Sequence, residues 1–78
     1  MQKTLYTEEY RRLITWLKEA RQSKGLTMRD LAEKLDTQHS FIGKIEQGER
    51  RLDVVEYLKY CRALDIAPDE GLRIIEKY

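Results

Sequence analysis

The stretch GLTMRDLAEKLDTQHSFIGKIEQGER, residues 25–50, carries the pattern that decides the fold. Within it, Thr27 and Asp30 have the spacing of a capping box, so a helix is predicted to begin near Met28. Leu31 starts an apolar stripe that recurs four residues later along the same helix. This helix is short, about two turns.

Asp36 interrupts that periodicity where a tight turn requires a positive φ, which Asp tolerates less well than Gly. Thr37 is the predicted cap of a second helix, whose apolar stripe runs through Ile42 while polar residues occupy the opposite side. Gly48 is predicted to end that helix. Two short helices joined in this way make a helix-turn-helix motif, here over residues 27–47.

The whole pattern resembles the Cro/CI-type (XRE) family of helix-turn-helix proteins, which includes phage repressors and small bacterial regulators. The resemblance extends from Leu13 to the C-terminus. The matching residues are Leu17, Arg21, Gly25, Leu26, Thr27, Leu31, Ala32, Leu35, Ile42, Lys44, Ile45, Glu46, Gly48, Arg50, Tyr57, Leu58, Ala63, Leu64 and Ile66. The resemblance implies a lambda-repressor-like, DNA-binding fold.

Three features depart from the family pattern. Met28 stands where the family usually has Gln, which removes one expected phosphate-binding side chain. Asp36 and Asp65 stand where Gly is usual, so the same turns are expected with a less suitable residue. Gly43 stands where the family tends to have Ser or Thr.

Three more helices are predicted around the motif. Thr7 caps a first helix that runs to about Lys24, Asp53 caps a fourth through Leu64, and Pro68 starts a fifth. The predicted inward residues are Tyr10, Leu13, Ile14, Leu17 and Ala20 in the first helix, Val54, Leu58 and Cys61 in the fourth, and Leu72 and Ile75 in the fifth. No strand pattern appears in the sequence, so we expect an all-α, compact five-helix bundle.

A chain of 78 residues allows one domain. We therefore expect a single domain over residues 1–78, with residues 1–6 flexible. Cys61 is the only cysteine, which excludes an internal disulfide and a cysteine-based zinc motif, and we expect it in the core rather than as a redox sensor. No cofactor or metal is expected. No signal peptide, transmembrane run or lipidation motif appears, so a cytoplasmic location without membrane contact is expected.

The net charge of +1 is weak support for nucleic-acid binding, so the placement of charges matters more than their sum. The basic residues of the motif fall at helix ends and loops, where DNA phosphates would pass. The acidic residues fall mostly off the polar face of the second motif helix. Acidic and basic residues balance within the motif and the loop after it, residues 27–51, but their placement favours a DNA contact.

A recognition helix reads base edges with the exposed side chains near its N-terminus, while phosphate contacts hold it in register. The candidate base-reading residues are Gln38, His39, Ser40, Gly43 and Lys44. The candidate phosphate-binding residues are Thr27, Arg29, Gln47, Arg50 and Arg51. Each of the phosphate candidates could also be a solvated surface residue, and only their joint placement supports a contact.

Arg21 lies near the apolar face of the first helix, where a guanidinium would be costly without an acidic partner. Glu46 is the natural partner. Because family members pair these positions, the resemblance implies a partly buried bidentate bridge between the first and third helices. The alternative is two solvated charges that do not interact strongly.

Four large residues do not fit the predicted inward stripes of their helices. They are Trp16, Tyr60, Ile74 and Tyr78. Single exposed apolar residues are common in monomers, but this number in a short chain favours a dimer interface. Within the family the C-terminal helix commonly supplies such an interface, and a two-fold dimer would bind an inverted repeat.

The sequence therefore predicts a transcriptional regulator of the prokaryotic or phage repressor type. It is expected to bind specific sequences of double-stranded DNA as a homodimer. The alternative is a protein-interaction module or antitoxin that binds a partner protein, with DNA binding secondary. The neutral motif and Met28 favour this alternative slightly, and Lys44, Arg50 and Arg51 argue against it. An enzyme is not expected. The sequence has one His and one Cys, and its acidic residues show no convergent pattern from which a catalytic site could be built.

Overall fold

The computed structural model describes residues 7–77. It contains α1 (Glu8–Ser23), α2 (Met28–Leu35), α3 (His39–Glu46), α4 (Val54–Leu64) and α5 (Pro68–Glu76), and no strand within the described residues. The expected all-α, five-helix architecture is confirmed. None of the described helices is both long and apolar enough to span a membrane. The expectation for residues 1–6 and the dimer candidate Tyr78 fall outside the described residues.

Local capping interactions set the predicted helix starts. Thr27 and Asp30 form the reciprocal capping box of α2, with hydrogen bonds of 3.0 and 2.9 Å. Asp53 and Glu56 form the same arrangement at the start of α4. Pro68 occupies the first turn of α5, where its missing N–H has no cost. The capping bonds join residues only three apart in the sequence, so the starts of these helices could be predicted from the sequence.

The two unusual aspartates adopt the turn conformations that the family pattern requires. Asp36 has φ 56° after α2, and Asp65 has φ 58° after α4. Both are left-handed, a region that is strained for most residues with a side chain and milder for Asp. The Gly-to-Asp departures therefore leave the turn geometry unchanged.

Thr37 does not cap α3, contrary to prediction. Its backbone N–H instead donates to the carbonyl of Ala32 at 2.9 Å and closes the end of α2. Gln38 occupies the N-cap position of α3 and makes no side-chain capping bond. Because the left-handed turn at Asp36 directs the N–H of Thr37 back to α2, Thr37 belongs to the end of α2. The N-cap of α3 is therefore Gln38, one residue later than predicted.

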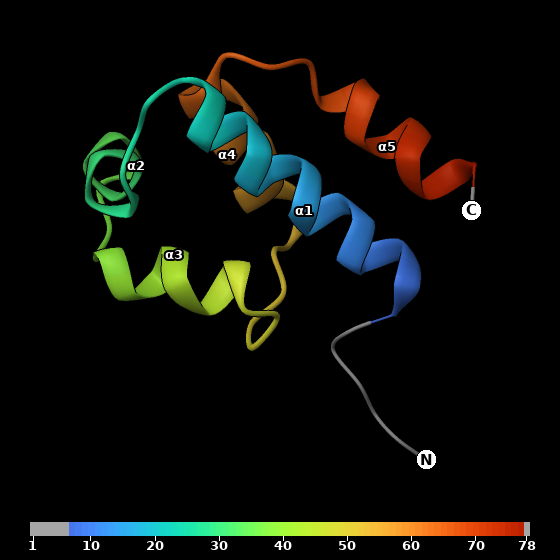
Figure 1. The fold of residues 1–78 in the computed structure, drawn as a ribbon, viewed down its shortest axis with the longest axis horizontal. Coiled ribbons are helices and arrows are strands. Elements are labelled where there is room, and N and C mark those ends of the chain that lie inside the picture. Colours follow the sequence, from blue (N-terminus) through green and yellow to red (C-terminus); the bar gives the residue numbers. More distant parts are fainter. Residues whose placement is uncertain (1–6, 78) are drawn as a thin grey trace.

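Twelve buried apolar residues form the core. They are Tyr10, Leu13, Ile14, Leu17, Leu31, Ala32, Ile42, Ile45, Tyr57, Tyr60, Cys61 and Leu64. α1 runs through the middle of the bundle and packs against α3, α4 and α5, while α2 packs against α3 and α4 (Figure 1). Cys61 is a core residue as expected, and burial raises the pKa of its thiol.

The rotation of α4 about its axis differs from the prediction. Val54 is 76% exposed and Leu58 is also exposed, although both were expected inward. Tyr57 and Tyr60 are buried instead, together with the correctly predicted Cys61. The stripe at spacings of three and four is satisfied by either set, and the set with the tyrosines faces the core, where the Tyr57 hydroxyl donates to the carbonyl of Pro68 at the start of α5.

The docking of α5 also differs from the prediction. Leu72 was expected inward but is 54% exposed, and Ile75 is half-buried. Gly71 faces the bundle instead: a Cβ there would lie 2.7 Å from Trp16 Cζ3 and also meet the Tyr57 hydroxyl. The α5 backbone thus approaches α1 and α4 directly, and this contact rotates Leu72 outward.

Candidate nucleic-acid interface

A buried ion pair holds α3 at a set angle to the rest of the bundle. Arg21 Nε lies 2.7 Å from Glu46 Oε2, and Arg21 Nη2 donates to Glu46 Oε1 at 3.1 Å. Arg21 Nη1 also donates to the carbonyl of Leu26 at 2.7 Å. The bonds to Glu46 raise the pKa of Arg21. The pair matches the bridge implied by the resemblance, and it joins α1, α3 and the loop before α2.

The two faces of α3 differ in polarity. Ile42 and Ile45 are fully buried against the bundle, while the residues at the start of the helix are exposed. α3 lies at the edge of the bundle with its outer side uncovered (Figure 1). Because no side chain caps its N-terminus at Gln38, its first N–H groups and the positive end of its dipole suit an anionic ligand such as a phosphate.

Two shallow recesses flank the start of α3. One has a volume of about 480 Å³ and is lined by Asp36, Thr37, Gln38, Ser40, Phe41, Lys44 and Arg50. The other is lined by Arg29, Ala32, Glu33, Thr37 and His39. The predicted base-reading residues therefore divide: Gln38, Ser40 and Lys44 gather in the first recess with Arg50, and His39 lies in the second with Arg29. Thr27, Gln47 and Arg51 are exposed but line neither recess.

Gly43 is half-buried in the middle of α3, against the first turn of α2. A Cβ at this position would meet only Met28 Sδ, at the ordinary contact distance of 3.9 Å. Packing therefore does not require a glycine here. Two of the departures from the family pattern, Met28 and Gly43, therefore lie next to each other.

Arg50 is more constrained than the sequence indicated. Its Nη1 and Nη2 donate to Glu56 Oε1 and Oε2 at 3.1 and 3.0 Å, and its guanidinium lies 4.7 Å from the centre of the Phe41 ring. Neither Glu56 nor Phe41 was among the predicted site residues. The spacing of these residues in the sequence gave no signal for the contact, because it crosses a loop. The Arg51 guanidinium lies over the Tyr10 ring, 5.1 Å from its centre.

The carboxylates near this surface are held in their charged form. Arg50, through its hydrogen bonds, lowers the pKa of Glu56, with the Asp53 backbone amide adding to the effect. The backbone and hydroxyl of Thr27 likewise lower the pKa of Asp30. Both acids are thus charged at neutral pH, and their charge is used within the fold.

The predicted dimer residue Tyr60 is inside the molecule. Its side chain is 1% exposed, and burial raises the pKa of its hydroxyl. Among the described residues this buried hydroxyl has no hydrogen-bond partner. A residue that fills the core cannot also contact a second chain, so Tyr60 is removed from the interface.

Two short helices at a fixed angle, with a polar outer face and basic residues in the following loop, define a helix-turn-helix DNA-binding protein. The family model described as "Helix-turn-helix" matches residues 17–71. The chain belongs to the XRE family of helix-turn-helix proteins, which are DNA-binding transcriptional regulators and not enzymes.

Solved structures agree with this assignment. An XRE-family like protein from Pseudomonas syringae pv. tomato str. DC3000 is 39% identical, with a TM-score of 0.82 over 88% of this chain and 84% of that one. The restriction-modification controller protein C.AhdI from Aeromonas hydrophila is 35% identical, with a TM-score of 0.75 over 85% and 98%. The controller protein C.Esp1396I, solved as a tetramer on its natural 35 base-pair operator, shares the fold at 22% identity, with a TM-score of 0.79 over 92% and 95%. A search of curated proteins gave no match.

Proposed function

We propose that this protein is a sequence-specific regulator of the repressor type that binds an inverted repeat in double-stranded DNA as a homodimer. The observation that carries the proposal is the outer face of α3, where Gln38, Ser40 and Lys44 share a recess with Arg50. Lys44 suits guanine O6 and N7, and Gln38 suits adenine or a phosphate. The likeness to a restriction-modification controller at 35% identity supports a regulatory role.

The homodimer follows from the size of one motif. A single helix-turn-helix covers only a few base pairs, whereas two related by a two-fold axis reach successive major grooves about 34 Å apart. Selection of bound sequences from randomised duplexes, at stated salt, tests the proposal directly. We expect an enriched inverted repeat with half-sites about one helical turn apart. Enrichment of no sequence, or of a single unpaired half-site, would contradict it.

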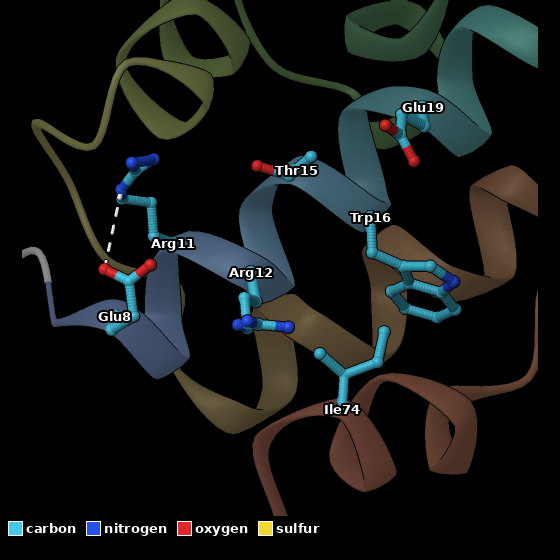
Figure 2. Close-up of a pocket in the computed structure, with 7 residues that line it drawn as sticks. All are labelled: Glu8, Arg11, Arg12, Thr15, Trp16, Glu19 and Ile74. Carbon is cyan, nitrogen blue, oxygen red and sulfur yellow. Dashed lines mark ion pairs between the residues drawn. The ribbon is translucent and has the colours of Figure 1, made fainter. Parts of the chain in front are cut away.

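We place the dimer contact on the N-terminal half of α4. Val54, Val55 and Leu58 lie on one side of this helix and are 76%, 59% and 36% exposed. Such a contiguous apolar stripe is typical of a protein interface. Two other predicted candidates are less suited because both are half-buried: Trp16 and Ile74 line a recess between α1 and α5, where they lie across from each other (Figure 2).

The same exposed stripe is the observation that favours the alternative, an antitoxin or interaction module that binds a different protein. The two proposals differ in what the purified chain does alone. A homodimer forms at micromolar concentration and selects an inverted repeat, whereas a module in which DNA binding is secondary remains a monomer without its partner and binds DNA only weakly.

A further inference from the structure

Arg50 donates two hydrogen bonds to the carboxylate of Glu56, and this fork uses only part of the hydrogen-bonding capacity of the guanidinium. Two bonds go to the carboxylate, and Nη1 also donates to the carbonyl of Arg51 at 3.0 Å. A guanidinium has five N–H groups. Among the described residues, Nε–H and one Nη2–H of Arg50 therefore have no acceptor, and 43% of the side chain is exposed.

Glu56 is itself fixed, because it belongs to the first turn of α4. Its Oε1 accepts the backbone N–H of Asp53 at 3.0 Å, and its own N–H donates to Asp53 Oδ1 at 2.7 Å. The low pKa of Glu56 keeps the carboxylate charged. The guanidinium of Arg50 is thus fastened to the rigid end of a helix rather than to a mobile surface acid.

The other side of the guanidinium contacts α3, the recognition helix. Phe41 of α3 lies under it, and both residues line the recess that contains Ser40 and Lys44. The stacked and forked geometry leaves Arg50 little freedom of rotation. Arg50 is held at the wall of the recess that faces DNA in the proposed function.

We propose that Glu56 is a positioning residue for DNA binding: it holds Arg50 against Phe41 so that the two remaining N–H groups meet a DNA phosphate without further ordering. This inference rests on the proposed function. Long side chains lose rotamer freedom when they bind, and a pre-ordered arginine avoids that loss.

The sign of the effect separates this role from simple electrostatics. An acidic residue close to DNA repels phosphates, so its removal would ordinarily strengthen binding. A positioning acid has the opposite effect, because its loss frees the arginine. Glu56→Gln is suitable, since Gln can still accept the Asp53 N–H of the capping box but offers one acceptor oxygen to the guanidinium instead of two.

The experiment measures Kd by fluorescence anisotropy on the duplex obtained by selection, at several salt concentrations. We expect Glu56→Gln to weaken binding about two- to tenfold, the range for ordering one such side chain. Glu49→Gln is the matched control: it removes the same charge from the exposed loop that joins α3 to α4, where Glu49 makes no fork with any described residue, and we expect it to bind equally well or more tightly. In an Arg50→Gln background, Glu56→Gln should cause no further weakening.

A second variant protects the test against misfolding. Arg50→Lys leaves Glu56 and its cap intact and keeps the charge, but an ammonium can neither fork nor present the remaining N–H groups. We expect it to weaken binding to a similar extent while the melting temperature of the free protein shows that it is folded. Glu56→Gln or Arg50→Lys with unchanged or tighter binding would overturn the positioning role. Selection of no duplex at all would instead count against the proposed function.

Discussion

The guanidinium of Arg21 and the carboxylate of Glu46 form a two-bond fork, buried to 9% and 3% exposure, that fastens α1 to the C-terminal end of α3. The recognition helix is only eight residues long, so its isolated stability is small. Its direction in space therefore depends on this fork and on Ile42 and Ile45 beneath it.

Removal of Glu46 should destabilise the protein strongly. Glu46→Ala leaves the Arg21 guanidinium buried without its carboxylate, and breaking a buried pair in this way costs about 3 to 5 kcal/mol. We expect a large fall in melting temperature, measured by circular dichroism. Glu49→Ala, an exposed change in the next loop, is the control and should have little effect. An unchanged melting temperature for Glu46→Ala would show that the fork does not stabilise the fold.

Lys44 should affect sequence preference, because it lies in the recess beside the start of α3. Lys44→Ala is expected to lose about 1 to 3 kcal/mol at one base position and to relax the preference there. Binding to a panel of single-base variants of the selected duplex measures this. An equal loss on every duplex would mean that Lys44 contacts only phosphate.

Arg51 provides the contrasting case. It lies outside both recesses and its guanidinium stacks over Tyr10, so it is placed for a phosphate rather than a base. Arg51→Ala should weaken binding to cognate and unrelated duplexes alike and reduce the salt slope by about one unit. A change at one base position only would assign it to base recognition instead.

The two helical glycines should respond in opposite directions to the same substitution. Gly43→Ala should stabilise the free protein by about 1 kcal/mol, because Ala favours the helix and its Cβ meets only Met28. Gly71→Ala should destabilise it by about 1 to 3 kcal/mol, because the Cβ would lie 2.7 Å from Trp16 Cζ3. Urea unfolding measures both. Weaker DNA binding by the stabilised Gly43→Ala variant would indicate that DNA approaches the helix backbone there.

The dimer proposal is tested by placing a charge on the exposed stripe of α4. Val55→Asp should give a monomer in sedimentation at micromolar concentration, because the charge would be buried unpaired in the interface. The monomer should remain helical, and its DNA binding should weaken while half-site preference persists. Ile74→Asp is the comparison. If that variant is monomeric and Val55→Asp is still a dimer, the interface lies at the α1–α5 recess instead.

Most helix boundaries were readable from the sequence because the interactions that set them are local. The capping pairs Thr27 with Asp30 and Asp53 with Glu56 each span three residues, and the turn at Asp36 involves its own backbone. The family pattern then supplied the pairing of Arg21 with Glu46, which no local interaction could indicate. From these features the fold class and the position of the recognition helix could be predicted.

The tertiary structure alone decided how the later helices are rotated and which side chains share a surface. The sequence of α4 offers two apolar stripes at similar spacing, and only packing against the other helices selects Tyr57 and Tyr60 over Val54 and Leu58. Gly71 carries no side chain, so no hydrophobic pattern could reveal that α5 docks through it. The fork between Arg50 and Glu56 likewise depends on how the loop after α3 folds back onto α4, because a contact across a loop is set by the path of the whole chain and not by residue spacing.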